Sequence, residues 1–460
     1  MMNNALNIQY EIEIPAGYKT TEVGVIPEDW KIAEIGTLIS DMRGGAPLKP
    51  SDFTKEGIMV LPKGAVVRGG LLKLSESDQQ FCTPEFAAKF SKNSVTEVFT
   101  IVVLRDLVPS GPSIGLMVKI PEPAFYILAQ GVYGFITSKG LIANYLIHYS
   151  NTYNYRRAVN EVMVGSTQVH ITNDAFKSLK IPLPIIAEQI AIARVLSDTD
   201  ALIASLEQLI AKKKAIKTAS MQQLMTGHTR LPQFSKHLNG TPKRYKASEL
   251  GKIPEDWTVL TIGTIADVKT GPFGSALHEK DYVQDGTPII TVEHLGELGV
   301  TYNNLPMVGD KDKAKLRSYQ LNIDDIVFSR VGSIDRNALI KSAENGWLFS
   351  GRLLRVRLLG RNNHAPYISY HFHTEPFKKR VIEVAVGQTM PSLNTNILKN
   401  ILILLPNSIA EQKAIAAILS DMDTELKALE QKLVKARDIK QGMMQQLLTG
   451  RIRLPLDHQP

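Results

Sequence analysis

Residues 187–232, AEQIAIARVLSDTDALIASLEQLIAKKKAIKTASMQQLMTGHTRLP, return later in the chain as residues 410–455, AEQKAIAAILSDMDTELKALEQKLVKARDIKQGMMQQLLTGRIRLP. Of these 46 aligned positions, 25 carry the same residue. A second segment, TEVGVIPEDWKIAEIGTL at residues 21–38, returns as SELGKIPEDWTVLTIGTI at residues 248–265. Self-similarity over such lengths indicates that one structural unit has been duplicated. The chain therefore contains two copies of one scaffold.

Between these repeated segments the two copies diverge, although their ends align again, with Tyr145–Gly165 matching Tyr367–Gly387. Each copy then has a polar loop, GSTQ or GQTM, and a short apolar strand that ends in proline, LKIPLP or ILILLP. The order along the chain is variable, constant, variable, constant. A fixed scaffold with two different intervening surfaces indicates that each surface recognises something different.

The constant segments have the heptad spacing of a coiled coil, with apolar residues at alternating steps of four and three. In the second copy this seam comprises Ile415, Leu419, Met422, Leu426, Leu429, Leu433, Ala436, Met443 and Leu447, and Lys440 interrupts it. In the first copy it comprises Ile192, Leu196, Thr199, Ile203, Leu206, Ile210 and Leu224, with Lys213, Lys217 and Ser220 at weaker positions. We therefore expect the two helices to pair with each other.

The ends of these helices are also marked in the sequence. Each follows a proline, has a glutamate in its first turn, and stops at Thr-Gly, where Gly227 or Gly450 is expected to adopt a left-handed conformation. A helix from Ala187 to Met225 would be about 58 Å long at 1.5 Å per residue. Because a globular module precedes each helix, an antiparallel pair would place the modules at opposite ends, related by an approximate two-fold axis. The helices would then act as a ruler about as long as 17 base pairs.

Composition narrows the class of protein. The chain has 460 residues and 44% hydrophobic residues, enough for several domains. No stretch is apolar enough to span a membrane, and the first residues do not have the pattern of a signal peptide. The single cysteine, Cys82, excludes an intramolecular disulfide and fits a reducing compartment, so we expect a cytoplasmic protein. A net charge of +8 favours a polyanionic partner.

At this point the sequence resembles the specificity subunits of type I restriction-modification systems. The resemblance rests on the I-P-E-D-W opening of each module, the GSTQ or GQTM loop, the L-P…A-E-Q helix entry and the M-Q-Q-L-(M/L)-T-G exit. It covers residues 20–455 in the order of the family. In the second module, TGPFGSALHEKDYVQDGTPII and DDIVFSRVGSIDRNALI also resemble family signatures, although Asp335 stands where many relatives have glycine.

The resemblance implies an α+β fold with two globular α/β target-recognition domains separated by two long antiparallel coiled-coil helices, with pseudo-two-fold symmetry. It predicts seven segments: an N-terminal extension, the first recognition domain, helix 1, a linker, the second recognition domain, helix 2 and a tail, at residues 1–20, 21–184, 185–227, 228–247, 248–406, 407–450 and 451–460. The linker, HTRLPQFSKHLNGTPKRYKA, contains five basic residues without periodicity, and we expect it to be solvated.

The resemblance also implies a subunit without a catalytic centre. It would recognise an asymmetric, bipartite site in double-stranded DNA and bind two methyltransferase subunits, which methylate adenine, and two ATP-dependent restriction subunits. S-adenosylmethionine, ATP and Mg would be used by those partners and none bound by this chain. In agreement, the sequence has neither an Asn/Asp-Pro-Pro-aromatic motif for adenine methylation nor a G-x-x-x-x-G-K-[ST] phosphate-binding loop.

Candidate DNA contacts are polar and basic side chains in the variable blocks, since base edges are recognised by donors and acceptors while lysine and arginine neutralise phosphate. In the first module the candidates are Arg43, Lys49, Lys63, Arg68, Arg105, Ser110, Ser113, Ser166, Thr167, Gln168 and His170. In the second they are Ser275, His278, Lys280, Ser329, Arg330, Ser333, Arg336, Gln388, Thr389, Ser392 and Asn394. Arg105 and Arg330 occupy aligned positions, each after an apolar strand.

Other features have plainer interpretations. Trp30 and Trp257 are expected to be packing anchors, and His371 and His373 lack the further ligands that a metal site needs. Glu411-Gln412-Lys413 has the E-x-K spacing of some nucleases, but its counterpart Glu188-Gln189-Ile190 lacks the lysine, so we assign it to the start of a helix.

Two alternative functions stay open from the sequence. One is the equivalent subunit of a related bipartite system in which nuclease and methyltransferase are fused in one polypeptide. The other is a coiled-coil assembly scaffold that binds proteins and no DNA.

Overall fold

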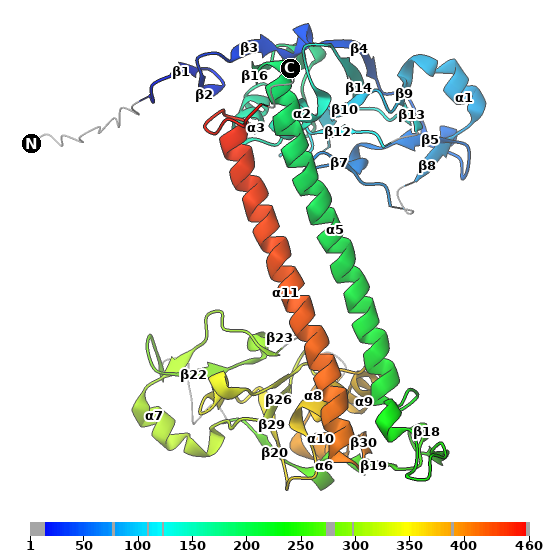
Figure 1. Ribbon diagram of the computed structural model, residues 1–460, viewed down its shortest axis with the longest axis vertical. Helices are drawn as coiled ribbons and strands as arrows, with labels where there is room; N and C mark the ends of the chain where they lie inside the picture. The colour runs from blue at the N-terminus through cyan, green and yellow to red at the C-terminus, as the bar shows by residue number, and fades with distance from the viewer. Residues whose placement is uncertain are drawn as a thin grey trace, which may run out of the picture. The chain divides into compact units, whose positions relative to one another are not determined.

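The computed structural model describes residues 14–75, 79–107, 110–121, 124–272, 281–296, 299–387 and 391–456. The chain divides into two units, of which unit 1 comprises residues 1–207 and 432–460 and unit 2 comprises residues 208–431. Both long helices cross this boundary, so each unit contains one part of each helix (Figure 1).

Two four-stranded sheets form the globular part of unit 1. The first has the order β12-β10-β14-β4, with bounds Met117–Lys119, Thr100–Val103, Val132–Thr137 and Ile39–Gly44, and all its pairs are antiparallel. The second has the order β8-β5-β13-β9, with bounds Gln80–Cys82, Ile58–Leu61, Phe125–Leu128 and Ser94–Thr96. In this second sheet β5 and β13 are parallel.

Unit 2 also has two four-stranded sheets. Its first sheet has the order β20-β29-β26-β27, with bounds Ala266–Thr270, Leu353–Leu358, Ile326–Ser329 and Asn337–Leu339. Its second has the order β21-β25-β22-β28, with bounds Tyr282–Val283, Met307–Val308, Thr287–Ile290 and Leu348–Phe349, and β22 and β28 are parallel. The duplication seen at the constant segments thus extends to the strand order of the first sheet and to the parallel pair of the second, whereas the edge strands of the second sheet differ.

Two-stranded pairs complete the sheets. In unit 1 they are β1–β2 (Tyr18–Thr21, Gly24–Pro27), β3–β16 (Lys31–Glu34, Lys180–Leu183), β6–β7 (Val66–Val67, Leu71–Leu72) and β11–β15 (Arg105–Asp106, Val169–His170). In unit 2 they are β17–β18 (Tyr245–Ser248, Gly251–Pro254), β19–β30 (Trp257–Thr261, Leu402–Pro406) and β23–β24 (Leu295–Gly296, Gly299–Val300). Strands β16 and β30 are the apolar strands predicted before each long helix.

Short helices accompany the sheets in both units. Those of unit 1 are α1 to α4, at Pro84–Lys89, Ala143–Tyr149, Tyr153–Glu161 and Asn173–Lys177. Those of unit 2 are α6 to α10, at Ile262–Ile265, Asp310–Lys315, Ala365–Phe372, Glu375–Val384 and Thr395–Asn400. The long helices are α5, Ile186–Met225, and α11, Ile409–Leu447.

Within each unit, α5 and α11 lie side by side and run in opposite directions (Figure 1). In unit 1 Asp200 pairs with Lys440 and Glu207 with Arg437, so residue numbers rise on one helix as they fall on the other. In unit 2 Lys213 pairs with Glu425 and Lys217 with Asp423. Every residue of the predicted seam is buried or half-buried, which confirms the heptad assignment.

The lysines that interrupt the seam take part in ion pairs. Lys440 is 13% exposed, and its Nζ lies 2.5 Å from Oδ1 of Asp200. Asp200 in turn lies near His148 on α2, 3.9 Å away. In unit 2 Lys217 pairs with Asp423, which accepts a hydrogen bond from Tyr370 on α8 at 2.8 Å. A polar pair at a seam position fixes the register of two helices at some cost in stability.

The helix ends also agree with their sequence signals. Gly227 and Gly450 have φ of +72° and +69°, as predicted. A Cβ atom at Gly227 would lie 2.5 Å from Cγ of Pro254, and one at Gly450 would lie 2.4 Å from Cγ of Pro27. Glycine is therefore required both by its backbone conformation and by the close approach of the I-P-E-D-W segment.

Candidate nucleic-acid interface

In unit 1 several candidate DNA contacts gather on the short ribbon β11–β15. Arg105 is exposed and lies opposite His170 in the strand register. The carboxylate of Asp106, the next residue on β11, accepts hydrogen bonds from the backbone and side chain of Ser113. The ribbon therefore brings His170 to two candidates from a distant part of the sequence, Arg105 and Ser113.

The GSTQ loop extends from this ribbon. Ser166, Thr167 and Gln168 are all exposed, and a bridge between Val164 and His170 closes the loop at its base. Gly165 has φ of +111°, and a Cβ there would lie 2.1 Å from the carbonyl oxygen of Gln168. Ser110 is exposed on the neighbouring loop. The loop thus presents hydroxyl and amide groups to solvent at the end of a fixed support.

Arg43 lies on β4 and is held by three groups. Its Nε and Nη2 donate to the carboxylate of Asp41, at 3.1 Å and 2.7 Å, and its Nη1 donates to the carbonyl oxygen of Ser94 at 2.7 Å. Its guanidinium also lies over the ring of Phe99, 4.5 Å from the centroid. The hydrogen bonds from Arg43 lower the pKa of the Asp41 carboxyl, so this carboxylate is ionised at neutral pH.

The three remaining candidates of unit 1 lie on loops. Lys49 and Arg68 are exposed, and Lys63 is half-buried at the start of a short 3-10 turn. Arg68 precedes Gly69, whose backbone NH donates to Asn151 at 3.0 Å. These residues do not join the β11–β15 ribbon through any contact among the described residues.

In unit 2 the loop after β26 lies against the segment after the GQTM loop. Leu393 donates its backbone NH to the carbonyl oxygen of Arg330 at 2.8 Å, and Gly332 donates to Pro391 at 3.2 Å. Ser392 bridges Val331 in the strand register. Ser333 and Arg336 are exposed on this loop. The structure therefore brings Arg330, Ser333, Arg336 and Ser392 together.

The aligned arginines of the two units differ in their surroundings. Arg105 is exposed, whereas Arg330 is half-buried and donates to carbonyl oxygens of Leu393 and Gly351, at 3.2 Å and 3.4 Å. The predicted equivalence is therefore wrong by one residue. Arg105 lies opposite His170, whereas Val331 lies opposite the aligned Ser392, so Arg330 occupies the place of Leu104.

Two candidates of unit 2 have structural roles that argue against a direct DNA contact. Ser329 is fully buried in β26, so its hydroxyl is not accessible to DNA. Asn394 caps α10 by accepting a hydrogen bond from the backbone of Ile397 at 2.8 Å. The predicted contacts Ser275, His278, Lys280, Gln388 and Thr389 lie outside the described residues.

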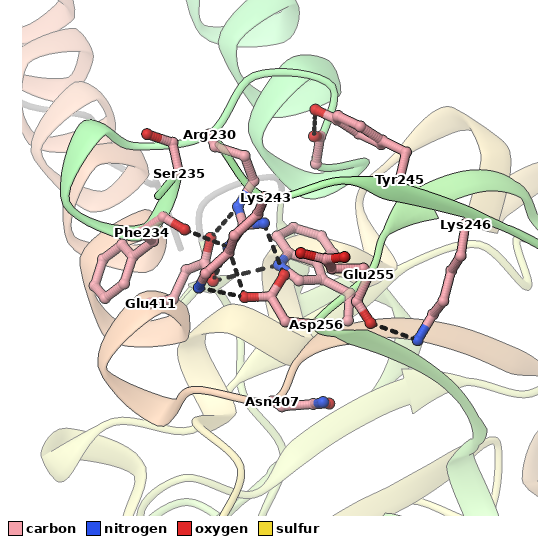
Figure 2. A network of polar contacts seen from close by, with 12 residues as sticks. Arg230, Phe234, Ser235, Lys243, Tyr245, Lys246, Glu255, Asp256, Asn407 and Glu411 are labelled. Atoms are coloured by element: carbon pink, nitrogen blue, oxygen red, sulfur yellow. Dashed lines mark hydrogen bonds and ion pairs between the residues drawn. The ribbon is translucent and has the colours of Figure 1, made fainter. Parts of the chain in front are cut away.

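A repeated polar cluster was not foreseen from the sequence. In unit 2, Arg230 donates from Nε to Glu411 at 2.7 Å and from Nη1 to Asp256 at 2.8 Å (Figure 2). Trp257 donates from Nε1 to the same Glu411, and Lys243 pairs with Asp256 at 2.7 Å. Arg230 is 6% exposed and Glu411 is 1% exposed. We call these residues, with their counterparts in unit 1, the clasp of each unit.

Unit 1 has the same clasp. Arg453 donates to Glu188 and, at 3.0 Å, to Asp29, while Trp30 donates to Glu188 at 3.1 Å. In both units Asp and Trp come from I-P-E-D-W, Glu from A-E-Q, and Arg from the R-L-P that follows the other long helix. The clasp therefore ties the end of one long helix to the start of the other and to the first strands of the module.

The contacts in the two clasps test several predictions made from the sequence. Trp30 and Trp257 are 1% and 0% exposed, which confirms that they are packing anchors. Glu411 belongs to the start of α11, as predicted. The prediction of a solvated linker is wrong for Arg230 and Lys243, because both are bound to carboxylates of unit 2. The signal that could have revealed the clasp was the arginine shared by HTRLP and RIRLP.

Within the part of the chain that the structure describes, no helix combines the length and apolar character needed to cross a membrane.

Comparison with known families gives one match that covers both copies. The model of the type I restriction modification DNA specificity domain matches residues 27–215 and again residues 254–436. The two matches together cover more than half of the chain and coincide with its two repeats.

Relatives of similar length support this match. The chain is 23% identical over 437 residues to the type I restriction enzyme MjaVIII specificity subunit of Methanocaldococcus jannaschii, covering 93% of this chain and 94% of that protein. It is 20% identical over 456 residues to the EcoKI specificity subunit of Escherichia coli, covering 93% and 90%. A crystal structure of a type I restriction-modification S subunit from M. genitalium has the same fold, with a TM-score of 0.58 at 16% identity, covering 91% of this chain and 96% of that one.

Proposed function

Because the chain belongs to the family of type I restriction-modification DNA specificity subunits, we propose that it selects the DNA sequence on which a multi-subunit restriction and methylation enzyme acts. The observation that carries the proposal is that two units share the strand order of their first sheet but present different exposed polar loops. Each unit would recognise one half of an asymmetric, bipartite site in double-stranded DNA. An excess of eight positive charges favours association with the polyanion.

The proposal assigns catalysis to partner subunits. Two methyltransferase subunits would methylate adenine with S-adenosylmethionine, and two restriction subunits would use ATP and Mg for translocation and cleavage. This chain would bind none of these cofactors itself. Its work would be done in the cytoplasm, where the DNA and the cofactors are available.

Exposed glutamines shared by the two copies are candidate contacts with those partners. Gln208 and Gln222 on α5 and their counterparts Gln431 and Gln445 on α11 are all exposed. They lie outside the seam, so pairing of the helices does not account for their identity. Two equivalent sets would suit two identical methyltransferase subunits, and Gln208→Arg with Gln431→Arg should weaken their co-purification with this chain.

The test is to co-express the chain with its methyltransferase subunits and measure both binding and product. We expect the complex to bind one duplex sequence tightly, with an affinity that falls steeply with salt. Sequencing that detects methylated adenine in the host genome should give one bipartite motif. A complex that binds all duplexes equally, or none, would contradict the proposal and favour an assembly scaffold.

Catalysis by the chain alone is tested separately. The purified chain, given labelled S-adenosylmethionine and DNA, should transfer no methyl group. A genomic neighbour that fuses nuclease and methyltransferase would instead favour the related bipartite system, with the same role for this chain.

A further inference from the structure

Strand β4 of unit 1 is interrupted at Asp41 and Met42. Its register with β14 pairs Arg43 with Gly134 and Ser40 with Ile136, so two residues of β4 lie opposite the single residue Phe135. This is a β-bulge, a feature that changes the direction of the side chains around it and occurs often beside functional sites. The matching strand of unit 2, β20, pairs with β29 from Ala266 to Thr270 without a shift. The bulge therefore belongs to one of the two variable surfaces.

The bulge places Asp41 in an unusual backbone conformation. Its φ is +42°, in the left-handed region that residues with a Cβ rarely adopt. The carboxylate then reaches Arg43, two residues on, and binds its Nε and Nη2 together. The local backbone thus serves to hold one guanidinium in one orientation.

The guanidinium keeps unused donors. Arginine has five N–H groups. Asp41 takes one from Nε and one from Nη2, and the carbonyl oxygen of Ser94 takes one from Nη1. Within the described residues, one N–H on each terminal nitrogen is left for an external acceptor. Arg43 also lines an open pocket of about 470 Å³ with Asp41, Met42, Gly44, Ser91 and Lys92.

The carboxylate of Asp41 beside Arg43 favours a neutral acceptor over a phosphate at this guanidinium. Asp41 is 45% exposed and compensates the charge of Arg43, so an approaching phosphate would meet a carboxylate at the same edge. Guanine instead presents two neutral acceptors, O6 and N7, in the major groove, and arginine binds them with two donors.

The position of Arg43 also fits a DNA-facing surface. In the sheet, Gly44 lies opposite Tyr133, and the adjacent Val132 lies opposite Val103. Arg105 follows this end of β10, so Arg43 and Arg105 lie at the same end of the sheet with β14 between their strands. Strands two positions apart are about 10 Å from each other, which is within the span of one groove.

Resting on the proposed function, we propose that the Asp41–Arg43 pair is a base-recognition element of unit 1 that selects a guanine in its half-site, with Asp41 as the positioning residue. The matching strand β20, within the described part of unit 2, has no such bulge, so this element would help to make the site asymmetric.

The experiment uses the complex of the full chain with its methyltransferase subunits. Affinity is measured for the methylated motif and for duplexes that replace each guanine of the unit 1 half in turn. For one of these positions, Arg43→Ala should reduce the discrimination between guanine and the other bases by roughly 5- to 150-fold. Asp41→Asn, which keeps the shape of the side chain but not its charge, should reduce discrimination at the same position by a smaller factor.

Lys92→Ala is the matched control, because Lys92 lines the same pocket, whereas the ion pair that Asp41 forms within the described residues is with Arg43. It should lower affinity for all duplexes alike, if it has any effect. Thermal unfolding of each complex identifies a variant that fails to fold, and Arg43→Lys then replaces Arg43→Ala, since lysine keeps the charge without the paired donors.

Two results would overturn the inference. One is that Arg43→Ala leaves discrimination unchanged at every position. The other is that it weakens all duplexes equally and reduces the salt dependence by about one phosphate contact. Failure of the proposed function would look different, because the unaltered complex would then show no bipartite motif at all.

Discussion

His371 on α8 is a fully buried imidazole without a polar partner. It is 4% exposed, it packs edge-on against Phe377, and neither ring nitrogen has a hydrogen-bond partner among the described residues. Burial lowers its pKa from 6.5 to about 3. Between pH 6.5 and about 3, the ring therefore stays neutral in the folded chain, whereas in the unfolded chain it takes up a proton.

This histidine makes stability depend on pH. Its contribution is fully present above pH 6.5, and it is lost as the pH falls toward 3, because only the unfolded state then gains the proton. One such group removes about 1.4 kcal/mol per pH unit in that window. His371→Leu should therefore flatten the dependence of unfolding free energy on pH between 6.5 and 4.5, as measured by urea unfolding at several pH values. Parallel curves for variant and parent would show that the imidazole does not titrate differently on folding.

Arg230 is the residue on which the clasp of unit 2 depends. Arg230→Ala would leave Glu411, 1% exposed, without its cation. Breaking a buried pair in this way costs about 3–5 kcal/mol. Arg453→Ala in unit 1 should cost less, about 1–3 kcal/mol, because Arg453 is 40% exposed and water can replace part of its contacts.

The measurement is thermal unfolding of the full chain, with local stability followed by hydrogen exchange in each unit. Arg230→Lys is the control, since it keeps the charge but cannot bond Glu411 and Asp256 with one planar group. Equal losses for Arg230→Ala and Arg453→Ala would mean that burial of the arginine does not set the strength of the clasp.

At the scale of single residues, the sequence predicted which large side chains are buried, but it did not predict which polar side chains bind each other. The tryptophans of I-P-E-D-W were predicted to be packing anchors, and both are buried. The arginines that bind the aspartates of the same motif are 26 residues from those aspartates in unit 2 and 424 residues from them in unit 1. Sequence spacing cannot reveal a contact that exists only because two helix ends meet. The same holds for Asp41–Arg43, whose geometry depends on a bulge against β14.

At the scale of elements, the long helices were the most predictable part of the fold. Heptad spacing and a terminal glycine are local signals, and the observed helices begin within one residue of Ala187 and Ala410. The strand order of the modules was not predictable in detail, because short strands in variable blocks carry no register signal. The seam lysines, expected to weaken the pairing, instead form ion pairs across it.

The pair Lys440–Asp200 tests what such a lysine does. Lys440→Met alone leaves Asp200, 18% exposed, without a cation, and should cost about 1–3 kcal/mol. Adding Asp200→Leu should recover most of this loss, since an apolar pair at a seam position is often as stable as an ionic one. A double-mutant cycle measured by chemical unfolding gives the coupling. Losses that simply add would show that the two side chains do not depend on each other.

At the scale of the whole molecule, the repeated architecture predicts that the variable block of a unit can be exchanged. The variable block of unit 2 lies between two constant segments, which carry its clasp and its part of the helix pair. Replacing residues 266–400 with the corresponding block of a relative should therefore preserve folding and binding of the methyltransferase subunits. It should change only one half of the methylated motif, because unit 1 keeps its own loops and its Asp41–Arg43 pair.

The measurement is the methylation map of a host genome that carries the exchanged chain. One retained half and one new half are expected, whereas a motif changed in both halves would contradict independent recognition by the two units. A second experiment introduces Asp41→Asn and Arg43→Ala into the exchanged chain and maps its methylated motif again. If recognition is divided between the units, these substitutions should relax the retained half alone, since the new block of unit 2 forms no part of their support.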